Sequence, residues 1–340
     1  MLFQFGVSCV ILFCGGDHSR ATMGTAVQWD ERIGRRLKLR DLHIFMTVAQ
    51  QGSMGRAAKQ LAVSQPVVSK VISDLERMLK VRLVDRTIKG VVPTVYGSAL
   101  LRRSAIVFDE LGHSVEEIEF LANPAAGEVR IASAEPLNST FLPAVIDRLS
   151  RKFPRLSFYV FSTPGGTAQD LEILNERRVD LALAYVPAPF EHDDLTAEFL
   201  FSDALVVVAS RDSKWARRRK IELAELVDEP WCLPAKESRA GPLVARAFRD
   251  RGLGPPRNFV TTDSTHLRAA LIATGRVLSP FGTTRLQLSG KHLGVKAVPV
   301  DLRIPFGSVG IVTLKNRTIN PAAQLFIEGA RQLAKQLAET

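Results

Sequence analysis

The amino-acid sequence predicts an α/β protein that begins with an all-α winged helix-turn-helix. Two short helix patterns lie close together between Gly52 and Leu79, and a hairpin signal follows at Lys89-Gly90. Beyond Gly127, strand patterns alternate with helix patterns, which is typical of a sheet covered by helices. A chain of 340 residues is long enough to fold these parts as two or three domains.

The positive charge of the chain is concentrated in the first of these parts. The net charge is +10, and the segment from Lys38 to Arg103 holds twelve Lys or Arg against four Asp or Glu. Such a concentration favours a local nucleic-acid surface, although a solvated basic surface would give the same count. A charged content of 24% and a hydrophobic content of 46% are typical of a globular protein.

The N-terminus and the cysteines give two further expectations. The first twenty residues are apolar, but no basic segment precedes the apolar run and no small-residue cleavage site follows it. We expect residues 1–37 to be a disordered extension, with Met23 as an alternative start; a signal peptide or membrane anchor remains the other interpretation. Cys9, Cys14 and Cys232 have no spacing typical of a metal site or a disulfide framework, which fits the cytoplasm.

Two helices are predicted before the helix with the polar face. The first has an apolar face of Leu39, Leu42, Phe45, Met46 and Ala49. Gly52 ends it, and Ser53 caps a second helix whose small face includes Ala57 and Ala58. Small side chains let another helix approach closely.

A third helix follows a tight connection. Ser64 is its expected cap, and Pro66 lies in its first turn. Its buried stripe is Val68, Val71, Ile72, Leu75 and Leu79, which leaves an opposite face of Gln65, Ser69, Lys70, Ser73 and Arg77. In a helix-turn-helix this face enters the major groove, where Gln, Ser and Lys can contact bases or phosphates. A plain solvated face is the alternative.

The hairpin after the third helix is expected to form a wing. Arg86, Thr87 and Lys89 are placed there to contact phosphate or the minor groove. The candidate DNA-binding residues are therefore Ser53, Arg56, Ser64, Gln65, Pro66, Ser69, Lys70, Ser73, Arg77, Arg86, Thr87 and Lys89.

A long helix from about Val95 to Leu121 follows, with Thr94 as its cap. Its apolar residues have near-heptad spacing: Leu100, Val107, Leu111, Val115 and Ile118. This spacing predicts a dimer seam, while packing of the stripe on its own chain is the alternative. The predicted boundaries are 38–95 for the winged helix-turn-helix, 96–123 for a linker and dimerisation helix, and 128–338 for the second α/β part.

The stretch "LRDLHIFMTVAQQGSMGRAAKQLAVSQPVVSKVISDLERMLKVRLVDRTIKGVVPTVYGSALL" resembles the LysR-type transcriptional regulator family. Its Gly-Ser, Ala-Ala, Ser-Gln-Pro, Leu-Glu, Leu-x-Asp-Arg and Thr-x-x-Gly elements occur in the family's order and spacing. Two residues depart from the family pattern: Lys80 stands where Gly is usual, and Val84 replaces a usual Phe. The resemblance implies a sequence-specific DNA-binding regulator whose promoter binding responds to a small-molecule effector.

The alternation of strands and helices in residues 128–338 predicts a mainly parallel sheet. The same part resembles the family's effector-binding region, which implies two α/β subdomains with a cleft, similar to type-2 periplasmic solute-binding proteins. Ala273 and Arg177 stand where the family often has Gly.

Three groups of residues follow a predicted strand and precede a predicted helix. They are Ser133 and Glu135, Thr163 and Gly165, and Thr262, Asp263 and Ser264. Ligands in α/β sheets bind at such positions, so we expect these residues to bind the effector. Simple helix capping explains the Ser, Thr and Asp residues as well. Glu135 indicates an effector with hydroxyl or amine donors, and a sugar or an aromatic acid is the expected class.

Other classes of protein fit less well. The sequence has no nucleophile elbow, P-loop, zinc-protease motif or dinucleotide fingerprint, so we predict no enzyme, no cofactor and no metal. A solute-binding transport protein would need export, and a redox sensor would need a reactive cysteine pair. The expected partners are promoter DNA, the effector, a second copy of the chain as a homodimer or homotetramer, and RNA polymerase, with no membrane.

Overall fold

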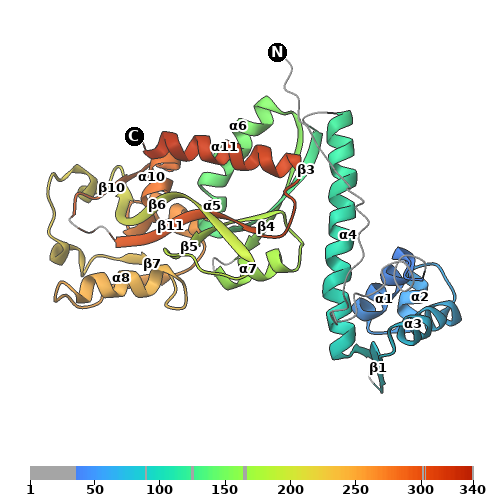
Figure 1. Cartoon of the computed structure of the whole chain (residues 1–340). Coiled ribbons are helices and arrows are strands. Elements are labelled where there is room, and N and C mark those ends of the chain that lie inside the picture. Colours follow the sequence, from blue (N-terminus) through green and yellow to red (C-terminus); the bar gives the residue numbers. More distant parts are fainter. Residues whose placement is uncertain are drawn as a thin grey trace, which may run out of the picture. The chain divides into compact units, whose positions relative to one another are not determined.

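The structure is a computed structural model that describes residues 36–88, 90–123, 126–163, 167–300, 302 and 304–338. The chain divides into two compact units between Ser104 and Ala105 (Figure 1). The predicted N-terminal extension lies outside the described residues, except for residues 36 and 37. In the described part of the chain, no helix is both long enough and apolar enough to span a membrane.

Three short helices form the body of the N-terminal unit: α1 (Leu39–Gln51), α2 (Met54–Gln60) and α3 (Gln65–Leu79). Gly52 ends α1 with a left-handed φ of 56°, and the Ser53 hydroxyl accepts a hydrogen bond from the Arg56 amide at 3.4 Å. Ser64 occupies the N-cap position of α3, but its side chain makes no capping bond. The tight turns therefore fall where the sequence predicts them.

The predicted apolar faces of these helices meet in one core. Its largest buried members include Phe45 of α1 and Ile72 of α3, and the small Ala57 of α2 lets the helices approach. Leu75 is the last buried residue of the predicted α3 stripe, and Leu79 at the end of the helix is exposed.

A two-stranded wing follows α3. Strand β1 (Val84–Thr87) pairs antiparallel with β2 (Gly90–Pro93). The carboxylate of Glu76 accepts hydrogen bonds from the amides of Leu83 and Val84, at 2.8 and 3.3 Å, and so holds the wing to α3. Lys80 between them has a left-handed φ of 57°, the conformation for which Gly is favoured.

Helix α4 (Val95–Ala122) follows the wing, and the boundary between the two units falls within it. The Thr94 hydroxyl accepts from the Gly97 amide at 3.1 Å, as an N-cap does. Gly97 lies so close to the wing that an added Cβ would be 2.0 Å from the carbonyl oxygen of Leu83. Leu100 packs against the core of the N-terminal unit, while Val107, Leu111, Val115 and Ile118 are exposed on the chain.

The C-terminal unit contains a seven-stranded sheet of order β10-β6-β11-β5-β3-β4, with β9 paired to β6. The strands are β3 (Ala126–Ala134), β4 (Arg155–Thr163), β5 (Leu181–Val186), β6 (Leu195–Ser210), β9 (Ser279–Gly282), β10 (Val295–Ala297) and β11 (Ile304–Leu314). A separate pair consists of β7 (Trp231–Leu233) and β8 (Asn258–Thr261).

The prediction of a mainly parallel sheet is wrong. Only β3 forms parallel pairs in this sheet, with β4 and β5; the pairs of β11 with β5 and β6, and of β6 with β9 and β10, are antiparallel. The reason is that β6 and β11 are long strands that run in opposite directions. On β6 the chain leaves the first α/β subdomain for the second, and on β11 it returns.

Helices cover both subdomains. In the first, α5 (Glu135–Asn138), α6 (Phe141–Lys152) and α7 (Thr167–Asn175) follow strands, and α11 (Pro321–Ala338) packs beside α6 (Figure 1). In the second are α8 (Ala240–Arg249), α9 (Thr265–Ala273), α10 (Thr283–Ser289) and the short helices η2 (Lys214–Arg217) and η3 (Leu223–Leu226). Ser139 and Thr140 separate α5 from α6.

Candidate functional site

The polar face of α3 is open to solvent within the N-terminal unit. Gln65, Lys70, Ser73 and Arg77 are exposed, and Ser69 is half-buried. The guanidinium of Arg86, on β1, donates a hydrogen bond of 3.3 Å to the Ser69 hydroxyl. The face of α3 and the base of the wing are thereby joined into one polar surface.

The other candidates near this surface have local roles as well. Arg56 donates to the carbonyl of Gln51, and Thr87 donates to the carbonyl of Gly90 at 3.1 Å across the hairpin. Arg77 forms an exposed ion pair with Asp74 at 2.9 Å. Pro66 is exposed in the first turn of α3. Lys89 lies outside the described residues.

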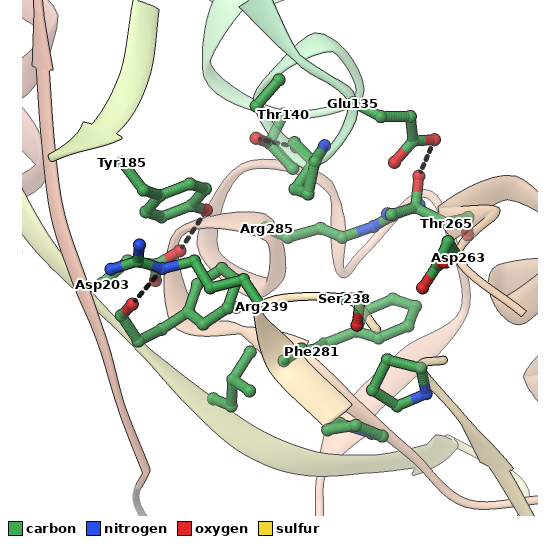
Figure 2. A pocket seen from close by; sticks show the side chains of 18 of the residues that line it. Glu135, Thr140, Tyr185, Asp203, Ser238, Arg239, Asp263, Thr265, Phe281 and Arg285 are labelled. Atoms are coloured by element: carbon green, nitrogen blue, oxygen red, sulfur yellow. Dashed lines mark hydrogen bonds between the residues drawn. The ribbon is translucent and has the colours of Figure 1, made fainter. Parts of the chain in front are cut away.

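A cavity lies between the two subdomains of the C-terminal unit, where β6 and β11 cross from one to the other. It encloses ≈ 760 Å³ of empty space, part of it open to solvent. The first subdomain contributes residues around α5 and the end of β5, and the second contributes α8, α9, α10 and β9 (Figure 2). Its walls include the apolar Leu205, Pro280, Phe281 and Phe306.

One side of the cavity is organised around Asp203. Its carboxylate accepts hydrogen bonds from the Tyr185 hydroxyl at 3.1 Å, the Thr283 hydroxyl at 2.8 Å and the Thr284 amide at 3.1 Å. Burial and then the charge of Asp203 raise the pKa of Tyr185 well above its usual value, so the phenol stays a donor. Arg239 lies over the Tyr185 ring, 5.7 Å from its centroid.

Two buried arginines also line the cavity. Arg268 of α9 donates to the carbonyl of Pro280 at 3.1 Å. Arg285 of α10 donates to the Ser139 hydroxyl at 3.2 Å and to the carbonyl of Thr265 at 3.3 Å. Figure 2 shows Arg285 extending from the side of Asp203 toward Thr265.

Glu135 joins the two subdomains across this cavity. Thr265, at the start of α9, donates its hydroxyl proton to Oε1 of Glu135, at the start of α5 (Figure 2). The Ser139 and Thr265 hydroxyl oxygens are 3.3 Å apart. The cavity is thus closed on one side by contacts between the subdomains.

The predicted effector residues divide into two groups. Glu135 and Asp263 line the cavity, and Gly165 lies outside the described residues. Ser133, Thr163, Thr262 and Ser264 are not among the lining residues. Ser264 and Thr262 have local roles, because Ser264 caps α9 by accepting from the Leu267 amide at 3.2 Å, and Thr262 accepts from the Ser264 amide at 3.1 Å.

Sequence reasoning missed the charged residues that dominate the cavity: Asp203, Arg239, Arg268 and Arg285. Arg268 and Arg285 lie within helices and Asp203 within a strand, rather than at strand ends. The only signal was an arginine on an otherwise apolar helix in "THLRAALIA", which is unusual for a buried face.

One cluster has the residue types of a metal site. Asp109, Glu110 and His113 bring possible ligand atoms within 4.8 Å of one another. The carboxylate of Asp109 already accepts hydrogen bonds from Arg177 and Arg317. Two guanidinium charges at this position disfavour a further cation, so the cluster is better described as an ion-pair network.

Both halves of the chain match family models. Residues 39–98 match the bacterial regulatory helix-turn-helix protein model of the lysR family, and residues 122–335 match the LysR substrate binding domain. The HTH-type transcriptional regulator TdcA of Escherichia coli (strain K12) is 28% identical over 303 residues, 87% of this chain and 93% of that protein. GbpR of Azospirillum brasilense, another HTH-type transcriptional regulator, is 28% identical over 302 residues, 87% of this chain and 86% of that protein.

Solved structures have the same fold. Full-length CbnR complexed with its target DNA aligns with a TM-score of 0.55 at 20% identity, over 87% of this chain and 99% of that one. A full-length OxyR variant from Pseudomonas aeruginosa aligns with a TM-score of 0.57 at 21% identity, over 88% and 95%. The chain therefore belongs to the LysR family of DNA-binding transcriptional regulators, in which a helix-turn-helix part precedes an effector-binding domain and which are not enzymes.

Proposed function

We propose that the protein reads promoter DNA with the polar face of α3 and that a small molecule in the cavity modulates this binding. The observation that carries the first part is the exposure of Gln65, Lys70 and Ser73 on a helix whose opposite face is buried. In a helix-turn-helix, this second helix lies in the major groove.

Individual residues have different roles in this proposal. Gln65 and Ser69 contact base edges, and Lys70, Arg86 and Lys89 hold phosphates. Ser53, Arg56, Ser64, Pro66, Ser73, Arg77 and Thr87 complete the interface. The hydrogen bond from Arg86 to Ser69 fixes the wing relative to the reading helix, so Ser69 serves both the interface and its geometry.

A dimer presents two reading helices to two half-sites. We assign residues 38–95 to DNA binding, 96–123 to a linker and dimerisation helix, and 128–338 to effector binding. The exposed apolar stripe of α4, Val107, Leu111, Val115 and Ile118, supports a homodimer, which can pair further into a homotetramer. The protein acts in the cytoplasm, where promoter DNA and RNA polymerase are its macromolecular partners.

The effector site in this proposal is the cavity between the subdomains, with Glu135 and Asp263 among its polar residues. A ligand that contacts both subdomains favours the arrangement of the subdomains in which all of its contacts form at once. Its binding therefore increases the fraction of molecules in that arrangement. A sugar and an aromatic acid are the two effector classes that the sequence suggests.

Two measurements test this function. Selection of duplexes from a random DNA pool with the full-length protein should recover a motif of two half-sites, and recovery of no sequence preference would contradict it. A thermal-shift screen against sugars, aromatic acids and amino acids should identify the effector class, since a ligand that binds the folded state raises Tm. An effector that raises Tm should also change DNA affinity.

A further inference from the structure

Two arginines are buried in the cavity with no carboxylate at ion-pair distance in the described part of the chain. Arg268 and Arg285 are 8% and 6% exposed, and their hydrogen bonds go to carbonyl and hydroxyl oxygens. The Nε atom of each is buried and has no hydrogen-bond partner there. Buried charges in proteins are normally paired, so these two groups are suited to receive an anion.

No carboxylate that lines the cavity forms an ion pair with these arginines. The charge of Glu135 attracts both guanidinium groups from beyond ion-pair distance, and its Oε1 accepts from Thr265. Asp203 is surrounded by the hydroxyl and amide donors of Tyr185, Thr283 and Thr284. Asp263 accepts from the amide of Ala235 at 3.0 Å. Neither carboxylate is within ion-pair distance of a described arginine.

The surroundings of Arg285 indicate the same deficit of negative charge. Burial, and then the positive charge of Arg268, lower the pKa of Arg285 to about 10. Both guanidinium groups face the ring of Phe281, at 5.8 Å for Arg268 and 4.6 Å for Arg285. Both charges therefore lie beside the same ring, which provides an apolar surface next to them.

Glu135 offers the complementary group on the other subdomain. Its Oε1 accepts from Thr265, while its Oε2 is buried without a hydrogen-bond partner among the described residues. A carboxylate oxygen only accepts, so Oε2 is suited to a ligand hydroxyl or amine. The apolar walls at Leu205 and Phe306 leave room for a hydrocarbon body.

We propose that the effector is a small organic acid whose carboxylate binds Arg268 and Arg285 and which also carries a hydroxyl or amine that donates to Glu135. This inference rests on the proposed effector cavity and narrows its ligand class. It favours an acid over the uncharged sugar. An Arg–carboxylate contact is charge-assisted and directional, so it selects for the free acid.

The test uses the full-length protein and matched pairs of probes. Lactate, mandelate and phenylalanine are each compared with their methyl esters, phenylacetate serves as an acid without the second donor, and galactose as a neutral polyol. We expect Tm to rise with acids that carry a hydroxyl or amine, and calorimetry to give weaker binding for phenylacetate. Arg285→Gln should weaken binding of the acids by at least about tenfold, because a charge-assisted bond is lost.

Two control variants separate the possible failures. Arg246→Gln makes the same exchange on the exposed face of α8 and should leave binding unchanged. Ala240→Phe fills the cavity and should abolish binding; a correctly folded variant keeps the cooperative unfolding transition. A ligand that binds Ala240→Phe as tightly as the wild type overturns the cavity itself. Three other results overturn only the organic-acid class. The first is an ester or galactose that binds the wild type but not Ala240→Phe, and the second is an acid that binds Arg285→Gln as tightly as the wild type. The third is a screen in which no acid raises Tm.

Discussion

Asp109 on α4 and Arg317 in the turn before α11 form a two-pronged ion pair. Nε of Arg317 donates to Oδ2 at 2.9 Å and Nη2 donates to Oδ1 at 2.8 Å, and Arg177 donates to the same carboxylate. The Asp109 side chain is 11% exposed. Arg317 follows β11 and Arg177 precedes β5, the strands that carry Phe306 and Tyr185 into the cavity, so α4 is fastened to both.

Removing the charge of Asp109 should destabilise the C-terminal unit. Asp109→Asn removes the carboxylate that Arg177 and Arg317 share and leaves Arg317 the longer pair with Asp180 at 3.6 Å, so we expect a loss of unfolding free energy on the order of 3 kcal/mol. Urea unfolding followed by the fluorescence of the buried Trp231 measures this loss. The matched control is Asp250→Asn, which breaks an exposed ion pair with Arg246 and should change stability by less than about 1 kcal/mol. Equal, small effects of the two variants would contradict the importance of this pair.

The stabilisation by Asp109 should also depend on pH. Burial by itself raises the pKa of this carboxyl, but the hydrogen bonds and charge of Arg317, with Arg177, outweigh burial and hold the pKa below 3.8. A carboxyl with a lowered pKa stabilises the fold above its unfolded-state pKa and loses this contribution as the pH falls through its folded-state pKa. The stability difference between wild type and Asp109→Asn should therefore be constant near neutrality and shrink below 3.8.

The neighbouring Asp180 acts in the opposite direction. Burial raises its pKa, although the amide of Arg130 and the charge of Arg317 oppose this rise. Its ionisation thus disfavours the fold as the pH rises through the ordinary range of a carboxyl. Arg317 pairs with both carboxylates, so the comparison of wild type with Asp109→Asn over pH reports on this coupled pair. If the stability difference between wild type and Asp109→Asn stays constant down to pH 3, the charge of Asp109 is not the source of that difference.

Two glycines on α4 should respond oppositely to the same substitution. A Cβ at Gly97 would be 2.0 Å from the carbonyl oxygen of Leu83, whereas a Cβ at Gly112 meets nothing within 4 Å. Gly97→Ala should destabilise the wing by about 1–3 kcal/mol, because helix and wing must move apart. Gly112→Ala should stabilise the helix by up to about 1 kcal/mol. Thermal unfolding measures both, and a neutral Gly97→Ala would mean that α4 does not lie this close to the wing.

The exposed stripe on α4 should hold two chains together. Leu111→Asp places a charge where an apolar contact is proposed, and it should weaken association at least about tenfold. Sedimentation velocity over a range of concentrations measures the association constant. Glu117→Gln, on the exposed polar part of the same helix, should have the wild-type value. An unchanged constant for Leu111→Asp would exclude this stripe as the seam.

Local sequence signals predicted the N-terminal unit more closely than the cavity. Gly52, Ser53 and Thr94 mark helix ends through their own backbone or side-chain chemistry, so their roles can be inferred from neighbouring residues alone. The sheet direction and the pair of Arg268 and Arg285 depend on contacts between segments far apart in the chain. No short-range pattern encodes such contacts, and the mainly apolar helix around Arg268 indicates neither its burial nor its pairing with Arg285.

Position after a strand predicted only some of the residues that line the cavity. Residues that follow strands do gather near ligand sites in α/β sheets, and Glu135 and Asp263 do line this cavity. Ser264, by contrast, follows a strand and serves as the cap of α9. Capping and ligand binding use the same residue types, so the sequence could not distinguish them.

The variant that isolates DNA reading is Gln65→Ala. Ser69 also accepts the hydrogen bond from Arg86, so its removal changes both the reading helix and the wing. Gln65 is exposed at the start of α3, and no described hydrogen bond holds its side chain. Its truncation therefore leaves the N-terminal unit intact and removes a single proposed base contact.

The most direct test of DNA reading by α3 is a binding titration of wild type, Gln65→Ala and Lys70→Ala against the selected duplex and a scrambled duplex at several salt concentrations. Gln65→Ala should lower the free-energy preference for the selected over the scrambled duplex by about 1–3 kcal/mol, because a base contact is lost. Lys70→Ala should weaken both duplexes alike and lower the salt slope by about one. A selected-to-scrambled ratio that Gln65→Ala leaves unchanged would contradict the assignment of α3 as the reading helix.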